Sequence, residues 1–497
     1  MTFQSAGAEK LRLLASAVTV AQSVTGPVGS GFAEGAGPAE TAGAEPVSAE
    51  SDSAETVSAD PAPDPADRLR LATAGSVDDG KSTLVGRLLF DSKSVLRDQL
   101  AAVEQVSLDR GLTSADLALL TDGLRAEREQ GITIDVAYRY FATPQRSFIL
   151  ADCPGHVQYT RNTVTGCSTA DVVVLLVDAR NGVLEQTRRH LAVAALLRVP
   201  HVIVAVNKID LVDFSAEVYA AIEADIRAVA AELGVAEIHV LPTSALLGDN
   251  IVEASASTPF YEGPTLLGLL ESLPTARDEG AFRLPVQLVI RPQGAAPTSE
   301  LRDYRGYAGQ ITSGTVRVGD PVVVLPSGRR SHVAGIDLGE RSLEEAVEGQ
   351  SVTVRLTDDI DVARGDTLAA AGDAPQVLTE VDARVSWLSE EPLRPRARVL
   401  LKHGAQTVQA IVRAIEGRLD LDDLTTVPAD HLELNDIGLV RLRLASPVPL
   451  ADYSVSRSDG AFLLIDAHEG GTLGAGMVQL AGAGRGEPAA AASSGRG

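Results

Sequence analysis

Residues Gly75–Ser82 have the types and spacing to hold a nucleoside triphosphate. They read GSVDDGKS and match the pattern GxxxxGK[ST]. In such a loop, backbone N–H groups and the start of the following helix bind phosphate oxygens. Lys81 would reach the β- and γ-phosphates, and Ser82 would ligate Mg²⁺. The predicted phosphate-binding residues are Gly75, Ser76, Val77, Asp78, Asp79, Gly80, Lys81, Ser82 and Thr83.

A second stretch, DCPGH, could sense the γ-phosphate. Asp152 could hold the Mg²⁺ shell through water, and the Gly155 N–H could contact the γ-phosphate. A loop that the γ-phosphate orders and its loss releases acts as a switch. Asp-x-x-Gly alone is common in turns, but here it follows a predicted strand. The predicted contact residues are Asp152, Cys153, Pro154, Gly155 and His156.

Three residues are candidates for catalysis at the γ-phosphate: Lys81, Thr133 and His156. The hydroxyl and carbonyl of Thr133, in EREQGITI, suit Mg²⁺ and γ-phosphate, although a threonine here could equally belong to a β-strand. His156 could position the attacking water. A lone histidine is more often structural, so this role depends on the motif. The predicted Mg²⁺ ligands are Ser82, Thr133 and Asp152.

A third group of residues predicts which base is bound. The Asp210 carboxylate in NKID could accept hydrogen bonds from guanine N1–H and N2, whereas adenine would leave it unpaired. A backbone N–H in Ser244–Leu246 could reach guanine O6. Together with the phosphate motifs, this order favours GTP over ATP. The predicted base-side residues are Asn207, Lys208, Ile209, Asp210, Ser244, Ala245 and Leu246.

Strand–helix alternation must position these motifs. Short apolar runs end where the motifs begin, and helical patterns separate them, which is typical of a parallel α/β sheet. The expected strands are Arg68–Ala74, Ser147–Ala151, Val172–Val177, His201–Val206 and Ile238–Pro242, with helices such as Lys81–Phe90 and Gln186–Leu197.

The rest of the chain has a different pattern. After Gly280, short alternating segments punctuated by Gly and Pro predict antiparallel β-barrels, including Leu284–Arg291, Tyr307–Ile311, Asp320–Leu325 and Ser351–Leu356. The fold class predicted is therefore an α/β P-loop GTPase domain followed by two antiparallel β-barrel domains. The expected units are a disordered, low-complexity extension (1–66), a GTP-binding domain (67–276), barrels at 281–372 and 377–481, and a disordered tail (482–497).

Composition excludes several classes of protein. A net charge of −24 argues against a non-specific DNA or RNA binder, which needs a basic surface. No apolar run reaches the roughly 18 residues of a membrane span, and two cysteines cannot form a disulfide framework. We expect a cytoplasmic protein. Only five of the 43 basic residues are lysine, and two of these, Lys81 and Lys208, lie inside the nucleotide motifs.

These motifs resemble those of translation elongation factors, and the chain is more specifically similar to the large, GTP-hydrolysing subunit of bacterial sulfate adenylyltransferase. The finer match lies in the P-loop Asp78-Asp79, in the stretch 122–141, and in RGYAG, LKHG and LNDIG beyond residue 300. It covers roughly residues 68–479. Cys153 departs from the threonine more common in that subunit, and the N-terminal extension has no counterpart.

The resemblance implies a division of labour between two subunits. A smaller partner would carry the ATP and sulfate site and form adenosine 5′-phosphosulfate, while this chain would hydrolyse GTP to drive the reaction. The sequence has no HxGH, HxxH or SGGxDS motif of its own. A heterodimer without membrane or DNA contacts is therefore expected. The alternative is an elongation-factor-like GTPase that delivers tRNA to the ribosome, which the acidic body disfavours.

Overall fold

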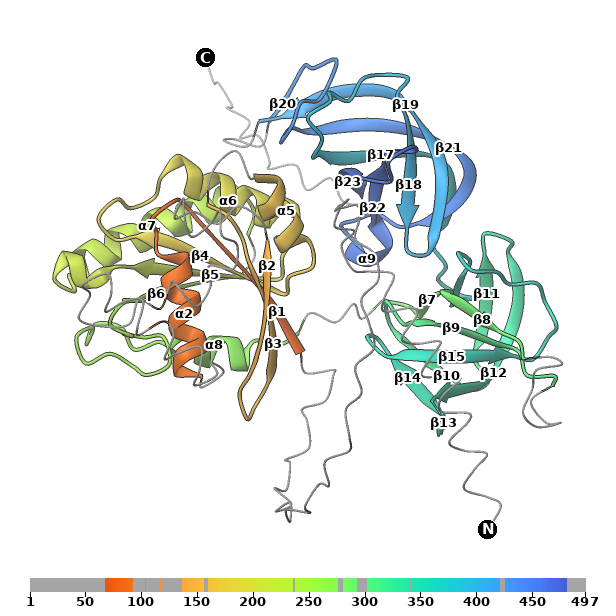
Figure 1. Cartoon of the computed structure of the whole chain (residues 1–497), viewed down its shortest axis with the longest axis horizontal. Helices are drawn as coiled ribbons and strands as arrows, with labels where there is room; N and C mark the ends of the chain where they lie inside the picture. The colour runs from red at the N-terminus through yellow and green to blue at the C-terminus, as the bar shows by residue number, and fades with distance from the viewer. Residues whose placement is uncertain are drawn as a thin grey trace, which may run out of the picture.

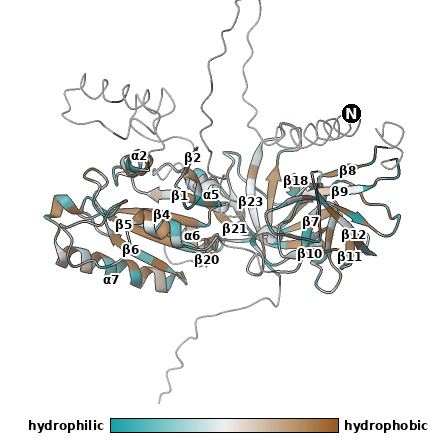
Figure 2. Cartoon of the chain, turned by 90° about the horizontal axis from the view of Figure 1, so that it is seen from below, coloured by the Kyte–Doolittle hydropathy of each residue, from teal (hydrophilic) through white to brown (hydrophobic). Residues whose placement is uncertain are grey.

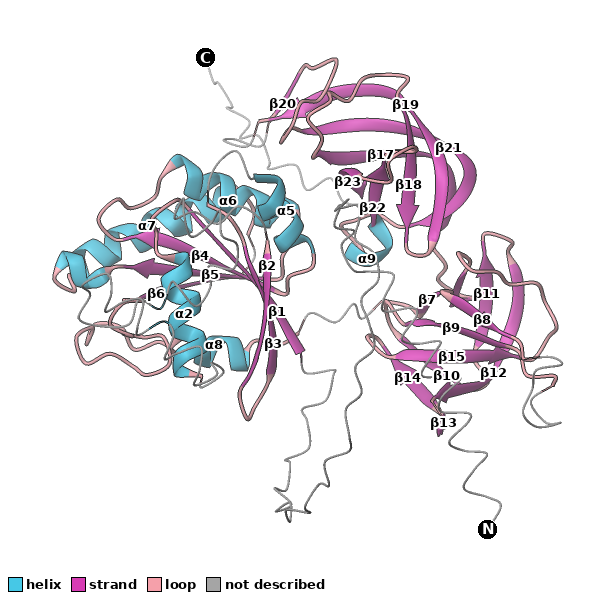
Figure 3. Ribbon diagram, in the orientation of Figure 1, coloured by secondary structure: helices cyan, strands magenta, loops and turns pink. Residues whose placement is uncertain are grey.

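The computed structural model describes residues 68–92, 103, 117, 136–155, 160–235, 237–275, 280–292, 302–339, 341–420 and 425–480. The predicted extension 1–66, the tail 482–497, and both Thr133 and His156 lie outside these residues. Figures 1 and 3 show an α/β domain beside two domains built of strands. Within the described part, no helix is long and apolar enough to cross a membrane.

The first domain is built on a six-stranded sheet in the order β2-β3-β1-β4-β5-β6. All neighbours are parallel except β2, which forms an antiparallel hairpin with β3. The central strands β4 and β5 are buried along their whole length, so they read as continuous apolar runs. The strands are β1 (Arg68–Gly75), β2 (Ala137–Ala142), β3 (Ser147–Asp152), β4 (Val172–Asp178), β5 (His201–Asn207) and β6 (Ile238–Pro242).

Helices cover both faces of this sheet, and the hydrophobic strands lie between them in Figure 2. One core packs α5, α6 and α7 on one face, and a second packs α2 and α8 on the other. The helices are α2 (Lys81–Asp91), α5 (Thr160–Ser168), α6 (Glu185–Leu196), α7 (Ala216–Glu232) and α8 (Leu266–Ser272). Ser215 and Thr265 cap the N-termini of α7 and α8 with their hydroxyls.

The second domain is an antiparallel sheet in the order β7-β16-β11-β12-β15-β9-β8, with β13 beside β12 and a separate β10–β14 pair. Alternating side chains such as Val322 and Val324 point into one core. Its strands are β7 (Arg283–Pro285), β8 (Leu288–Ile290), β9 (Gly306–Gln310), β10 (Thr315–Arg317), β11 (Pro321–Leu325), β12 (Arg329–Leu338), β13 (Arg341–Leu343), β14 (Glu345–Val347), β15 (Ser351–Leu356) and β16 (Thr367–Ala370).

The third domain is a closed antiparallel barrel, because β18 pairs with both β22 and β19. Closure removes the exposed edges of the sheet. Its elements are β17 (Gln376–Trp387), β18 (Arg398–His403), β19 (Gln406–Leu419), β20 (Thr426–Val427), β21 (Ile437–Leu450), α9 (Arg457–Gly460), β22 (Ala461–Ile465) and β23 (Thr472–Val478).

The third domain packs directly on the first. Ile437, Tyr453 and Met477 belong to the same hydrophobic core as α5, α6 and α7. The Tyr453 hydroxyl donates to the carbonyl of Leu197 just after α6, at 3.0 Å. Arg457 of α9 donates to the carbonyls of Ser168 and Ala170, so it caps the C-terminus of α5 with a positive charge.

The same short helix reaches the second domain. Asp459 forms a 3.2 Å ion pair with Arg283 of β7, and both side chains are nearly buried. Ser458 donates to the carbonyl of Thr312. The α9 turn therefore contacts all three domains.

The predicted fold class is confirmed: an α/β domain precedes two antiparallel β domains. In the first domain, each expected strand matches the observed one within a residue. The segment expected at Leu284–Arg291 divides into two strands instead. At Val286 and Gln287 the chain leaves its partner β16 and pairs with β9 through the Ala308 carbonyl.

Candidate nucleotide-binding site

The phosphate-binding loop connects β1 to α2, as the motif predicts. Gly80, at the N-cap of α2, has a φ of 94°, in the left-handed region that glycine adopts without strain. A Cβ atom there would lie 2.5 Å from the side-chain nitrogen of Asn207. Both the backbone angle and this close approach require glycine. Around it, Val77 and Asp78 are exposed and Ser82 and Thr83 are half-buried.

Lys81 lies inside the loop. Its ammonium donates to the carbonyls of Gly75 and Ser76 at 2.9 and 2.7 Å. Burial lowers the pKa of Lys81, and the nearby carboxylates of Asp79 and Asp152 oppose that effect. Among the described residues, these two carbonyls accept from an ammonium that has three N–H donors, so Lys81 has donor capacity to offer an incoming phosphate.

Asp79 stabilises the loop from within. Its carboxylate accepts a 2.6 Å hydrogen bond from the Ser76 N–H and is buried. Burial raises the pKa of Asp79, while the Ser76 N–H and Lys81 pull it down. The motif pattern leaves this position unspecified, so it does not predict this turn-closing contact.

Asn207 joins the base side of the site to the phosphate loop. Its side-chain nitrogen donates to the Asp79 carbonyl at 2.8 Å, and its oxygen accepts from the Ala245 N–H at 2.9 Å. The Thr243 hydroxyl also donates to that oxygen. One buried amide thus holds the ends of β5 and β6 against the loop after β1.

Lys208 also connects the base side of the site to the phosphate loop. Its ammonium donates to the Asp78 carbonyl and forms a 3.0 Å ion pair with Asp178. Asp178 also accepts two hydrogen bonds from the Arg180 guanidinium. Burial alone would raise the pKa of Asp178, but the bonds from Arg180 and Lys208 outweigh it and lower that pKa to about 2.

Asp178 lies outside the sequence motifs, although its ion pair with Lys208 places it in the site. Its place could have been inferred, because it ends the apolar run 172–177 and pairs in register with Asn207 on the neighbouring parallel strand. The carboxyl ends of such strands meet at one edge of the sheet, where α/β proteins bind ligands.

Asp210 is the second residue of the short helix η4 (Ile209–Val212) and is half-buried, whereas Ile209 is fully buried. Its carboxylate accepts no hydrogen bond from any described residue. It is therefore available to a ligand, with the Arg180 guanidinium as its electrostatic neighbour.

The hydrogen bonds in the loop after β6 indicate which of residues 244–246 can donate to guanine O6. The Ser244 N–H donates to the Asp249 carbonyl, and the Ala245 N–H is taken by Asn207. In the described part of the chain, the Leu246 N–H donates to no residue. Leu246 is also exposed, while Ser244 and Ala245 are buried. Leu246 is thus the one of the three predicted residues with a donor to offer a base.

The Asp152–Gly155 loop lies against the phosphate-binding loop. The Thr73 hydroxyl donates to Asp152 at 2.7 Å, and the Cys153 N–H donates back to Thr73 at 3.4 Å. A Cβ atom on Gly155 would overlap the Lys81 ammonium and the Gly75 carbonyl. Pro154 is buried. The loop thus contacts the lysine expected to hold the γ-phosphate.

The donor chemistry fits a magnesium nucleotide. Ser82 offers a hydroxyl at the start of α2 and Asp152 a carboxylate, both hard oxygen ligands of the kind Mg²⁺ prefers. The buried Ser76 hydroxyl has no hydrogen-bond partner among the described residues, so the loop also has an unused polar group. Within the same residues, no group of three His, Cys, Asp or Glu side chains forms a separate metal cage.

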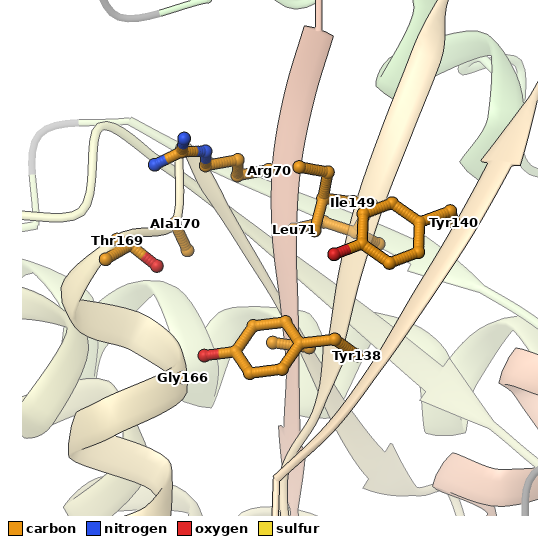
Figure 4. Close-up of a pocket in the computed structure, with 9 residues that line it drawn as sticks. Arg70, Leu71, Tyr138, Tyr140, Ile149, Gly166, Thr169 and Ala170 are labelled. Atoms are coloured by element: carbon orange, nitrogen blue, oxygen red, sulfur yellow. The ribbon is translucent and has the colours of Figure 1, made fainter. Parts of the chain in front are cut away.

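A further pocket opens between β1, β2, β3 and α5 (Figure 4). Its volume is about 250 Å³, and Tyr138 extends across it from β2 toward Gly166 of α5. Ala151 and Gly166 form the part of its wall nearest Cys153. The pocket is lined by Arg70, Leu71, Tyr138, Tyr140, Ile149, Ala151, Gly166, Thr169 and Ala170.

Comparison with known proteins agrees with this geometry. The family model described as "Elongation factor Tu GTP binding domain" matches residues 67–278, and "GTP-eEF1A C-terminal domain-like" matches residues 380–479. The chain is 50% identical over 417 residues to "Sulfate adenylyltransferase subunit 1" of Chromobacterium violaceum, which covers 83% of this chain and 86% of the relative. The protein of the same name from Cellvibrio japonicus is 48% identical over 414 residues, covering 82% and 86%.

A third relative is longer than this chain. The "Bifunctional enzyme CysN/CysC" of Mycobacterium tuberculosis H37Rv is 52% identical over 414 residues, which make up 82% of this chain and 67% of the relative. The P-loop, the base-side network and these similarities lead to the same conclusion. The chain belongs to the family of sulfate adenylyltransferase subunit 1, among the GTPases of the elongation factor Tu type.

Proposed function

We propose that this chain is the GTP-hydrolysing subunit of a sulfate adenylyltransferase and that residues 67–276 form its GTP-binding domain. The main supporting observation is the Asn207 amide, which hydrogen-bonds both the phosphate loop and the loop after β6. Base recognition and phosphate binding are therefore parts of one pre-organised site. Sulfate adenylyltransferase subunit 1 relatives are identical to it at about half of the aligned positions.

Guanine is selected by two groups that have no hydrogen-bond partner in the part of the chain that the structure describes. The Asp210 carboxylate accepts from guanine N1–H and N2, and the Leu246 N–H donates to O6. Ile209, Ser244 and Ala245 hold these two groups in place. Adenine would leave a donor and a carboxylate unpaired in the site, which disfavours ATP strongly.

Hydrolysis depends on groups around the γ-phosphate. The backbone N–H groups of residues 76–83 bind the phosphates, and Lys81 transfers its hydrogen bonds from the Gly75 and Ser76 carbonyls to phosphate oxygens. The Gly155 N–H contacts the γ-phosphate. His156 holds a water in line with the γ-phosphorus, so that the bond to the β–γ bridging oxygen breaks as the water adds.

Magnesium belongs to the same site. Ser82, Thr133 and Asp152 would hold Mg²⁺, with Asp152 acting through water. When bound, the ion neutralises charge that develops on the β- and γ-oxygens. Thr73 orients the Asp152 carboxylate for this purpose through their hydrogen bond.

The adenylyl transfer takes place on a partner. A smaller subunit binds ATP and sulfate and forms adenosine 5′-phosphosulfate and pyrophosphate, in a cytoplasmic heterodimer. This reaction is steeply uphill, and GTP hydrolysis on the present chain drives it. The barrels at 281–372 and 377–481 carry the nucleotide-dependent change beyond the first domain, through the α9 contacts described above.

Co-purification with an assay tests this proposal. The tagged chain should bring down a smaller protein from its own cell extract, and the pair should release pyrophosphate only when sulfate and ATP are present, faster with GTP than without it. Lys81→Ala should remove the GTP stimulation and leave the subunits associated. Recovery of tRNA, with no sulfate-dependent pyrophosphate release, would instead support a tRNA-delivering GTPase and contradict the proposal.

A further inference from the structure

The Asp178 carboxylate, at the end of β4, is bound by two cationic side chains that differ in their contacts. The Asp178 side chain is 2% exposed, whereas that of Arg180 is 47% exposed. Lys208 also reaches the phosphate loop, through the Asp78 carbonyl. Among the described residues, the Arg180 guanidinium hydrogen-bonds only Asp178. Any effect of Arg180 on the phosphate loop must therefore pass through that carboxylate.

The geometry of this contact uses every acceptor position of the Asp178 carboxylate. One oxygen, Oδ1, accepts from the Arg180 backbone N–H at 2.9 Å and from its Nε at 3.0 Å. The other, Oδ2, accepts from the Arg180 Nη2 at 2.6 Å and from the Lys208 ammonium at 3.0 Å. A carboxylate has about four such positions. The bonds from Arg180 thus fix the plane of the carboxylate and leave one direction from which Lys208 can approach.

The turn that carries Arg180 is closed by backbone groups. The N–H groups of Asn181 and Gly182 both donate to the Asp178 carbonyl at 3.0 Å. Gly182 has a φ of 65°, in the left-handed region that glycine adopts without strain. None of these bonds involves the guanidinium. Removal of the Arg180 side chain should therefore leave the turn intact and free only the carboxylate.

Lys208 depends on its side-chain contacts for its position. Its φ is 59°, in the left-handed region, which is unfavourable for a residue with a Cβ atom. Its ammonium is held by Asp178 and by the Asp78 carbonyl. Its backbone leads into η4, which contains Asp210. The orientation of Lys208 thus affects the phosphate loop and the base-side carboxylate together.

We propose that Arg180 is a positioning residue for guanine nucleotides. It orients Asp178, and Asp178 holds Lys208 between the phosphate loop and the base-side residues. The planar guanidinium suits this task, because it makes two bonds to one carboxylate in a fixed geometry that an ammonium cannot reproduce. The inference rests on the proposed function, since it requires that GTP and GDP bind at this site.

Release of a fluorescent GDP from the full-length chain tests the proposal. Arg180→Ala should speed release about tenfold, because charge-assisted hydrogen bonds that orient Lys208 are lost. Arg180→Lys should give an intermediate rate, since it keeps the charge but not the two-point contact. Arg227→Ala is a matched control. Arg227 also donates from two nitrogens to one carboxylate, that of Glu223 on α7, and its variant should release GDP like the parent chain.

A double-mutant cycle tests whether Arg180 acts through Lys208. Lys208→Ala alone should speed GDP release about a hundredfold, because its bonds to the phosphate loop and to Asp178 are both lost. A residue that acts only through Lys208 has no further effect once that side chain is absent. Arg180→Ala combined with Lys208→Ala should therefore release GDP within about twofold of the rate of Lys208→Ala.

Labelling of lysines gives a measurement that does not depend on nucleotide binding. The nucleotide-free chain is treated briefly with acetic anhydride, and modification of Lys208 is compared with that of Lys402, which is exposed on β18. Lys208 should be modified severalfold faster in Arg180→Ala than in the parent, because its ammonium is held less firmly. A parent chain that binds no GDP would contradict the proposed function, and the labelling would still decide whether Arg180 holds Lys208.

Four results would overturn the inference. The first is release of GDP from Arg180→Ala at the rate of the parent. The second is additive effects of Arg180→Ala and Lys208→Ala, which would mean that Arg180 contacts the nucleotide itself. The third is unchanged labelling of Lys208. The fourth is a urea unfolding midpoint that falls in Arg180→Ala but not in Arg227→Ala, with no intermediate release rate in Arg180→Lys, which would make Arg180 a structural residue.

Discussion

The base side and the γ-phosphate side of the nucleotide site are held very differently. On the base side, Asn207 bridges the phosphate loop to the neighbouring strand ends through buried hydrogen bonds, and Lys208 adds an exposed hydrogen bond and an ion pair. On the γ-phosphate side, Thr73 makes the two hydrogen bonds described for the start of the Asp152–Gly155 loop. The Thr163 hydroxyl also donates to the Pro154 carbonyl of this loop. The base side selects the nucleotide, whereas the Asp152–Gly155 loop responds to loss of a phosphate.

The largest expected effect tests the base side. Asp210→Asn should weaken GTP binding about a thousandfold, because a site built around a hydrogen-bonded group rejects a mismatched base. Binding of xanthosine triphosphate should strengthen, since the new amide donates to the extra xanthine carbonyl. Competition titrations with both nucleotides measure the switch. Unchanged GTP affinity would remove Asp210 from base recognition.

The next effect tests the γ-phosphate side. His156→Ala should slow hydrolysis roughly a hundredfold to a thousandfold and leave GTP affinity nearly intact, because positioning of water acts in the transition state. Single-turnover hydrolysis and equilibrium binding separate the two quantities. Equal losses in both would make His156 a structural residue and weaken the contrast between the two sides.

Asn207→Ala should weaken nucleotide binding about a hundredfold, because it removes three hydrogen bonds worth about 1 kcal/mol each. Asn250→Ala is a matched control. Asn250 is also buried, and it bonds Pro242, Ser255 and Thr258, but not the phosphate loop. The control should lower the melting temperature without a comparable loss of GDP affinity. Equal affinity losses would show that the base side depends on general stability and not on this bridge.

The smallest effect concerns His190 of α6, near Lys81. Burial lowers the pKa of His190 to about 3, and its Nδ1 has no partner among the described residues. Below about pH 6.5, His190 is protonated in the unfolded chain but stays neutral in the folded chain. The free energy of unfolding therefore decreases as the pH falls from about 6.5 toward 3. Between pH 7 and pH 5 this effect lowers the free energy of unfolding by about 2 kcal/mol.

His190→Gln should lack this part of the slope while keeping the side-chain contact to Gln186. Urea unfolding at pH 7, 6 and 5 compares the two chains. His403, whose pKa burial also lowers, contributes equally to both and cancels. Parallel stability profiles would show that His190 takes up its proton in the folded state.

The sequence predicted strand positions best where helices cover both faces of the sheet. Continuous runs such as 172–177 and 201–206 gave β4 and β5 nearly to the residue, because parallel strands covered on both faces need no alternation. The β7–β8 region was less predictable. Its division depends on a change of partner from β16 to β9, and such pairing is not encoded locally.

Prediction of the site has the same limit, because some of its contacts depend on residues that are distant in the sequence. The motifs predict the loops, and the structure places Asn207 and Lys208 against the phosphate loop. Which N–H groups remain available could not be read from a motif, since the Ala245 donor is used by a residue far away in the sequence. The roles of Thr133 and His156 stay predictions.

The core shared by the first and third domains has a consequence for synthesis. Ile437, Tyr453 and Met477 complete a core whose other buried residues all come earlier in the chain, the last of them being Val240. At roughly 5–20 residues per second, the ribosome supplies them on the order of ten seconds or more later. Until then the α5–α6 face of the nascent chain stays open to water and to chaperones. Limited proteolysis of stalled chains of increasing length would show protection of α5 only after residue 477 has emerged.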